Sequence, residues 1–200
     1  IACYDVEHDE LGLLAQSAIE LAEKRGGDQA VVNIQNEKIQ YFGGKVNAQE
    51  KNSTVIARIN TTAIKEAIEA AGMIFITCHN MADADSLSSM FGIACLCEAS
   101  DKDYRILFDI KKVDPTAQKI YKTIDAEQPD LLDNFILGEN ADIKNNSLVI
   151  IVDTQSPAIA MYPHILEQTK QVIVIDHHRR GEISFVDPLV YYVEPYASST

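Results

Sequence analysis

The segment Val172-Ile173-Val174-Ile175-Asp176-His177-His178 decides the fold class. Its four consecutive β-branched residues are typical of a strand, and polar residues follow where that strand would end. A continuous apolar run, rather than an alternating one, indicates a strand buried on both faces of a parallel sheet. Two further apolar runs, Met73–Thr77 and Leu148–Val152, precede it in the chain and predict two more such strands.

Stretches with helical spacing of apolar residues separate these strands. We expect helices over residues 61–71, 85–98, 114–126 and 157–168, and a further strand over 105–108. Strands that alternate with helices predict an α/β fold, a doubly wound and mostly parallel sheet. In such a sheet, ligands bind beyond the carboxyl ends of the strands.

The first part of the chain predicts a separate small unit. We expect a helix over residues 11–24, followed by a two-stranded hairpin that ends at Gly43-Gly44. Polar residues follow, so we expect a unit over 1–46, a linker over 47–59 and the α/β domain over 60–200.

Composition limits the partners and the setting of the protein. The net charge of −13 has the wrong sign for a surface that holds a nucleic acid duplex. The apolar runs are far shorter than the ~20 residues of a membrane span. The cysteines show no zinc-ligand spacing, so we expect reduced, structural thiols in the cytosol. The chain begins in a strand-like run and stops at Ser199-Thr200, which is typical of a helix start, so we expect further sequence on both sides.

Candidate metal ligands follow three of the predicted strands. His79, Asp83 and Asp85 follow the first strand, Asp153 follows the second, and His177 follows the third. Because the carboxyl ends of parallel strands meet at one edge, we expect these side chains to converge.

The spacing of these residues suggests two ions. His79 and Asp83 can fold back onto one ion, Asp85 and His177 can hold a second, and Asp153 can bridge both. Imidazole and carboxylate ligands without thiolate suit two Mn²⁺ ions better than structural zinc. Such a pair of ions generates a hydroxide nucleophile and stabilises a phosphoryl transition state.

The neighbouring residues fit a phosphate substrate. Arg179 and Arg180 follow the paired histidines, and guanidinium groups match phosphate oxygens. His178 would contact the phosphate or orient a metal ligand, and Asp176 would fix a histidine by a hydrogen bond. Taken singly, Asp83 also fits a helix-entry residue and the arginines also fit solvated charges. The convergence of three strand ends favours the metal site over a sheet with polar loops.

Together these motifs resemble the DHH phosphoesterase superfamily, over about residues 60–200. The segments Arg25-Gly26-Gly27-Asp28-Gln29, Tyr41-Phe42-Gly43-Gly44-Lys45 and Glu194–Thr200 are similar to one group within it. That group is the membrane-anchored bacterial cyclic-di-AMP phosphodiesterases, which carry PAS, degenerate GGDEF, DHH and DHH-associated domains. The resemblance implies that residues 1–46 end a degenerate GGDEF domain, and that residues 60–200 form a DHH domain that is truncated at its C-terminus.

The resemblance also implies an activity. It is Mn²⁺-dependent hydrolysis of the cyclic dinucleotide cyclic-di-AMP to the linear dinucleotide pApA, with His178, Arg179 and Arg180 at the substrate phosphate. One further metal-ligand aspartate of the family would lie beyond residue 200, because Asp187 stands too near the motif and is typical of a turn. The fragment alone is therefore expected to be weak or inactive.

The chain departs from the family near the first motif. Cys78 stands where the family has glycine, Met81-Ala82 replaces Asn-Pro, and Ser88 replaces a helix glycine. These changes bear on loop shape and substrate fit more than on metal binding. Two alternatives stay open: a DHH enzyme acting on oligonucleotides or pyrophosphate, and a non-catalytic nucleotide-signalling module. The resemblance implies a cytoplasmic domain, linked to a membrane only through segments outside this chain, and leaves a homodimer open.

Overall fold

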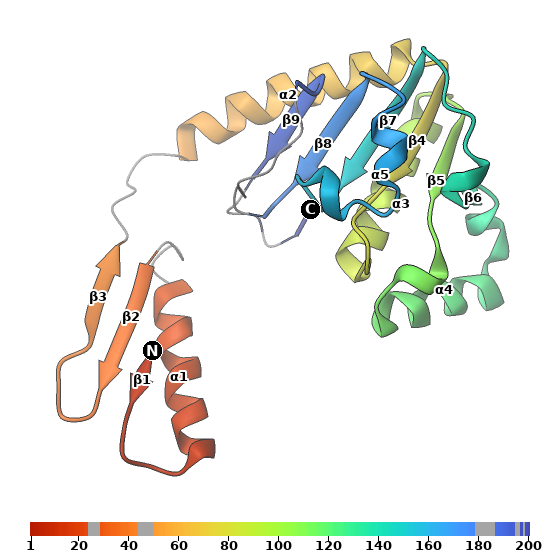
Figure 1. Cartoon of the computed structure of the whole chain (residues 1–200). Coiled ribbons are helices and arrows are strands. Elements are labelled where there is room, and N and C mark those ends of the chain that lie inside the picture. Colours follow the sequence, from red (N-terminus) through yellow and green to blue (C-terminus); the bar gives the residue numbers. More distant parts are fainter. Residues whose placement is uncertain (24–28, 44–49, 179–186, 195–196, 198) are drawn as a thin grey trace. The chain divides into compact units, whose positions relative to one another are not determined.

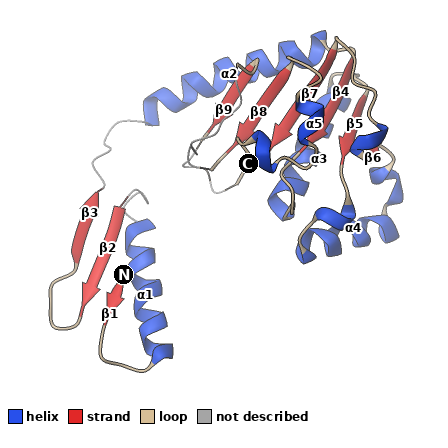
Figure 2. Ribbon diagram, viewed as in Figure 1, coloured by secondary structure: helices blue, strands red, loops and turns tan. Residues whose placement is uncertain are grey.

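The computed structural model describes residues 1–23, 29–43, 50–178, 187–194, 197 and 199–200 (Figures 1 and 2). The chain divides into two compact units, Ile1–Ser53 and Thr54–Thr200. Within the described residues, no helix has both the length and the apolar character needed to cross a bilayer.

The first unit contains the expected helix and hairpin. Its described elements are β1 (Ala2–Cys3), α1 (His8–Glu23), β2 (Gln29–Ile34) and β3 (Gln40–Gly43). Strand β2 pairs in parallel with β1 and antiparallel with β3. Asn36, with a φ of 65°, lies in the turn between β2 and β3, where asparagine tolerates the left-handed conformation.

The second unit is built on a parallel sheet of six described strands, in the order β6-β5-β4-β7-β8-β9. Every pairing in it is parallel, which confirms the predicted α/β fold. The strands are β4 (Met73–Thr77), β5 (Tyr104–Leu107), β6 (Phe135–Ile136), β7 (Ser147–Val152), β8 (Val172–Asp176) and β9 (Val190–Val193). The α-helices are α2 (Glu50–Ala70), whose first four residues precede this unit, α3 (Ala84–Ala99), α4 (Pro115–Glu127) and α5 (Pro163–Leu166). Short 3₁₀ turns lie at Ile110–Lys112, Pro129–Leu132, Gly138–Asn140 and Pro157–Ile159.

The core of this unit forms around the central strands. All six residues of β7 are buried, as a strand between two parallel neighbours requires. Helix α3 buries residues at helical spacing, so one face of it packs on the sheet. The residues that it buries are Ser86, Leu87, Met90, Ile93, Ala94 and Cys97.

Helix α2 differs from the sequence-based expectation. Residues 50–59, expected in the linker, belong to α2, which begins at Glu50 rather than at Thr61. The hydroxyl of Thr61 donates to the Ala57 carbonyl, 2.8 Å away, and that of Thr62 donates to the Arg58 carbonyl at 3.0 Å. Both threonine hydroxyls therefore donate to carbonyls four residues earlier in a helix that continues through them. The sequence pattern instead predicted that the helix starts at Thr61.

The predicted helix over 157–168 is wrong. The segment forms a 3₁₀ turn at Pro157–Ile159 and then the short α5, and between them Ala160 pairs with His79. Pro163 explains the break, because a proline disfavours helical backbone at the residue before it. The sequence reading also missed β6 and β9, which are short.

Candidate metal centre

The candidate site lies where the strand order reverses. After β4 the chain builds β5 on one side of that strand and places β7 on the other. The carboxyl ends of β4 and β7 therefore flank the switch point at which open α/β sheets bind ligands. His79 lies just beyond β4, Asp153 directly follows β7, and Asp176 ends β8.

The start of α3 fixes the first motif. Asp83 is the N-cap of this helix, and its Oδ1 accepts hydrogen bonds from the amides of Asp85 and Ser86 at 2.9 and 3.0 Å. Asp83 is thus a helix-entry residue, and it also belongs to a group of possible metal ligands. Asp85, two residues on, lies in the first turn of the helix.

Asp153 stands at the centre of the constellation. Its side chain is only 2% exposed, and its backbone has a φ of 60°. The Asp153 amide donates to the Ile175 carbonyl on β8, 2.9 Å away, which holds this left-handed residue in place. Its Oδ2 lies 3.3 Å from Nε2 of His79, whereas its Oδ1 lies 3.6 Å from Nε2 of His177. The two oxygens of one carboxylate therefore face different histidines.

The first cluster consists of His79, Asp83 and Asp153, whose ligand atoms lie within 4.8 Å of one another. Nδ1 of His79 lies 2.7 Å from the Asn80 carbonyl oxygen, which can only accept, so Nδ1 carries a proton. The Ser86 hydroxyl gives its one proton to Asp153 Oδ2 at 2.7 Å. Nε2 of His79 lies 2.8 Å from the Ser86 oxygen and donates to it when the ring is protonated.

The charges of His79 and Asp153 support each other. The hydrogen bond to Asp153 raises the pKa of His79 above 6.5, against the opposing effect of burial. Burial works to raise the pKa of Asp153, but hydrogen bonds from His79 and Ser86 outweigh it, so this pKa lies below 3.8. A proton on His79 Nε2 thus balances the buried carboxylate at the place a cation would take.

The second cluster consists of Asp153, His177 and His178, again within 4.8 Å. Asp85 adjoins it, with Oδ2 at 3.4 Å from Nε2 of His177. Nδ1 of His177 lies 3.2 Å from the Ala197 carbonyl and donates to it, so Nε2 is the nitrogen turned to the carboxylates. A carbonyl that fixes the tautomer in this way is typical of a metal-ligating histidine.

Asp176 orients His178 through a hydrogen bond. Asp176 is buried, and its Oδ1 accepts from Nδ1 of His178 at 2.7 Å and from the amides of His177 and His178 at 2.8 and 3.1 Å. Gln155 donates to its Oδ2 at 3.1 Å. The His178 side chain is 58% exposed, so this residue is oriented by the protein but open to solvent.

The donor set fits a hard or borderline cation. Both clusters offer imidazole nitrogens and carboxylate oxygens, the ligands that Mn²⁺ accepts readily. Cys78 lies beside His79, but burial raises the pKa of its thiol, so a thiolate ligand is disfavoured there. Mixed N and O ligands in two adjoining groups fit two ions that share Asp153.

The structure brings together all five residues that the sequence predicts as metal ligands. Arg179 and Arg180 lie outside the described residues, so their expected contact with phosphate stays a prediction. Sequence reasoning did not identify Ser86 and Thr200, which bind the Asp153 carboxylate. Serine and threonine are common at helix starts and in loops, so only their place beside the acidic motifs could have signalled such a role.

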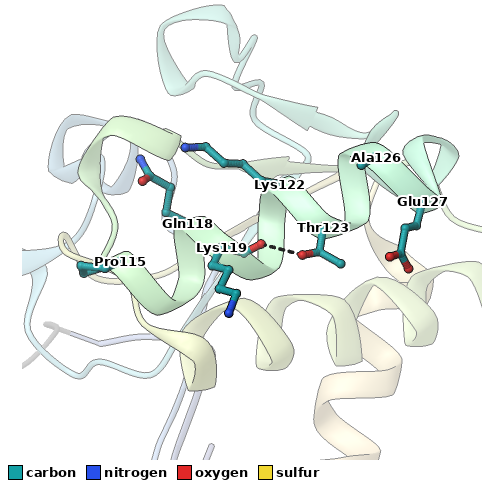
Figure 3. A pocket seen from close by; sticks show the side chains of 7 residues that line it. All are labelled: Pro115, Gln118, Lys119, Lys122, Thr123, Ala126 and Glu127. Carbon is teal, nitrogen blue, oxygen red and sulfur yellow. Dashed lines mark hydrogen bonds between the residues drawn. The ribbon is translucent and has the colours of Figure 1, made fainter.

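Two hollows on the second unit are lined by none of these carboxylates. One, of about 430 Å³, runs along α4, and Figure 3 shows that helix residues alone line it. It contains none of the candidate ligands. The other, of about 460 Å³, is lined by Asn80 and Lys112 and by residues 158–161 and Pro163. It adjoins the first cluster, because Asn80 directly follows His79.

Three curated proteins are similar to nearly the whole chain. A cyclic-di-AMP phosphodiesterase (GdpP) of Bacillus subtilis is 39% identical over 193 residues, and one of Geobacillus thermodenitrificans is 38% identical over the same length. The cyclic-di-AMP phosphodiesterase PdeA of Listeria monocytogenes is 34% identical over 193 residues. Each match covers 96% of this chain but 29% of the relative, so the chain spans less than a third of their length.

The chain is also similar to one solved structure and to one family of domains. The fold is similar to an exopolyphosphatase-related protein of Bacteroides fragilis, with a TM-score of 0.46 and 18% identity over 71% of this chain and 40% of that one. Residues 73–200 match the N-terminal domain of the DHH family, which covers β4 and every candidate ligand described above. The chain therefore belongs to the DHH family.

Proposed function

We propose that this chain carries the metal centre of a Mn²⁺-dependent phosphodiesterase that hydrolyses cyclic-di-AMP to pApA. The observation that carries the proposal is the buried Asp153 carboxylate, whose two oxygens face separate histidines of the two clusters. Three relatives that match 96% of the chain are named cyclic-di-AMP phosphodiesterases, which supports this substrate.

The five candidate ligands would form two ion sites that share one carboxylate. His79 and Asp83 would hold one Mn²⁺, Asp85 and His177 would hold the other, and Asp153 would bridge them. Bound ions would supply a hydroxide nucleophile near neutral pH and stabilise negative charge on the phosphoryl group. Water bound to such ions would have a lowered pKa, so no side chain would have to act as a dedicated general base.

His178 would act on the substrate rather than on an ion. Asp176 accepts from its Nδ1 and so fixes the tautomer, while the side chain stays open to solvent. A ring held in this way presents Nε2 outward, where it can donate to a phosphate oxygen when protonated. Arg179 and Arg180 would add charge-assisted hydrogen bonds to the same phosphate.

The rest of the chain suggests the setting of this activity. We propose that residues 1–46 form the C-terminal part of a degenerate GGDEF-like domain, on the resemblance carried by the segments around Gly26-Gly27-Asp28 and Gly43-Gly44. The same resemblance implies a cytoplasmic domain of a membrane-anchored protein, with any membrane link outside this chain. The acidic surface disfavours a nucleic acid duplex as partner.

A substrate panel tests the proposal. The full-length protein is given Mn²⁺ and is offered cyclic-di-AMP, pApA and pyrophosphate in separate reactions, with products separated by chromatography. Conversion of cyclic-di-AMP to pApA, lost on chelation and in Asp153→Ala, is the expected result. Cleavage of pApA or pyrophosphate alone would assign the protein to another DHH hydrolase, and no cleavage of any of the three would favour a non-catalytic module.

A further inference from the structure

We propose that Ser86 and Thr200 are positioning residues of the metal centre, each holding one oxygen of the Asp153 carboxylate. The inference rests on the proposed two-metal function and assigns roles to two residues outside its ligand set. Its basis is that the two hydroxyls donate to different oxygens of the Asp153 carboxylate, one beside each cluster.

Ser86 contacts all three members of the first cluster. Its hydroxyl donates to Oδ2 of Asp153 at 2.7 Å, and the same oxygen lies 2.8 Å from Nε2 of His79. Its amide donates to Oδ1 of Asp83 at 3.0 Å. Ser86 is fully buried in the first turn of α3, so water does not compete for these contacts.

Thr200 has the matching position at the second cluster. Its hydroxyl donates to Oδ1 of Asp153 at 3.1 Å, and its amide donates to Oδ1 and Oδ2 of Asp85 at 3.2 and 3.0 Å. Three residues earlier, the Ala197 carbonyl accepts from Nδ1 of His177. Asp85, Asp153 and His177 thus each receive a contact from this one short segment.

The two hydroxyls together fix the rotation of the Asp153 carboxylate. A carboxylate oxygen has two lone-pair sites, so it can accept a hydrogen bond and still bind an ion. With Ser86 on Oδ2 and Thr200 on Oδ1, one oxygen is turned toward each cluster before any ion arrives. Supporting groups of this kind typically change metal affinity by about 10- to 100-fold when they are removed.

A Mn²⁺ titration of the full-length protein tests the inference. Binding is measured by calorimetry and by the electron paramagnetic resonance signal of free Mn²⁺. Thr200→Val keeps the shape and the backbone amide of the residue but removes the hydroxyl, and Ser86→Ala removes the other. Each variant is expected to bind Mn²⁺ about 10- to 100-fold more weakly than the wild type. Thr200→Ser, which restores a hydroxyl, is expected to recover the wild-type affinity.

Ser88→Ala is the matched control. Ser88 lies on α3, two residues from Ser86, and its hydroxyl donates to the carbonyls of Ala84 and Asp85 rather than to a candidate ligand side chain. This variant should bind Mn²⁺ like the wild type. Wild-type affinity in both Thr200→Val and Ser86→Ala would overturn the inference, as would a failure of Thr200→Ser to restore binding. If the wild type bound no Mn²⁺ at all, the proposed function itself would fail, which is a distinct result.

Discussion

At the scale of single residues, the site combines buried charge with local backbone strain. Asp153 and Met81 both have a left-handed backbone, with φ of 60° and 61°. Aspartate tolerates this conformation far better than methionine does. Strain at a functional loop persists only when its surroundings hold it in place, as the Asp153 amide bond to Ile175 does.

Replacing Met81 with asparagine should stabilise the protein. The Met81 side chain is 58% exposed, so little packing is lost, and asparagine adopts a positive φ at lower cost. We expect Met81→Asn to raise the free energy of unfolding by about 1 kcal/mol in urea denaturation. Ile159→Asn, at another exposed apolar residue, is the control and should bring no such gain. An unchanged or lower stability in Met81→Asn would show that the backbone is not strained there.

The raised pKa of His79 predicts opposite pH trends for stability and for metal binding. In metal-free protein, the stability from the His79–Asp153 contact is fully present below the unfolded pKa of 6.5 and is lost as the pH rises through the higher folded pKa. Mn²⁺ must displace the proton on Nε2, so its affinity should rise over the same range. Thermal unfolding in chelator and Mn²⁺ calorimetry measure the two trends. His79→Gln should lose the pH dependence of both, and an unaltered profile in that variant would assign the trends to other groups.

Asp176 should affect catalysis more than metal binding. In Asp176→Asn an amide NH₂ replaces one carboxylate oxygen, so His178 loses its nearer carboxylate partner, at 2.7 Å, and keeps only the more distant Asp153, at 3.7 Å. We expect kcat to fall about 10- to 100-fold, while the wild-type number of Mn²⁺ ions stays bound. Steady-state kinetics beside Mn²⁺ titration separates the two effects. A loss of Mn²⁺ equal to the loss of activity would instead make Asp176 a support of the ligands.

At the scale of elements, the strands that carry the ligands were readable from sequence. Continuous apolar runs predicted β4, β7 and β8 nearly to the residue, because strands buried on both faces are apolar along most of their length. Because the candidate ligands stand just after these strands, their position at the carboxyl edge of the sheet could be predicted as well. Helix ends and short strands were less readable, since tertiary contacts decide them: α2 begins before its predicted start, and Pro163 divides a predicted helix.

The 3₁₀ turn at Gly138–Asn140 gives a test of packing at this scale. A Cβ at Gly138 would overlap ring carbons of Tyr162, which is 1% exposed and cannot turn aside. We expect Gly138→Ala to lower the free energy of unfolding by about 1–3 kcal/mol. Gly92→Ala is the matched control: Gly92 is exposed on α3 and its Cβ would meet nothing within 4 Å, so this variant should stabilise by about 0.5–1 kcal/mol. Equal effects of the two variants would contradict the packing described here.

At the scale of the whole molecule, the convergence of the candidate ligands was predictable, but the groups that hold them in place were not. His79, Asp83, Asp85, Asp153 and His177 stand at strand ends that a parallel topology must bring together. Ser86 and Thr200 are 114 residues apart in the chain, and only the folded sheet places both on Asp153. Histidine and aspartate motifs can be recognised in a sequence by their chemistry. Serine and threonine are common, so their role becomes clear only from their position in the fold.

The central claim is that two ions share Asp153, and counting bound Mn²⁺ tests it most directly. The full-length protein is titrated with Mn²⁺ under electron paramagnetic resonance, beside Asp153→Ala and the control Asp142→Ala, whose side chain is 80% exposed. The account predicts two magnetically coupled ions per chain in the wild type and in Asp142→Ala, and loss of the coupled pair in Asp153→Ala. Retention of both coupled ions in Asp153→Ala would contradict it.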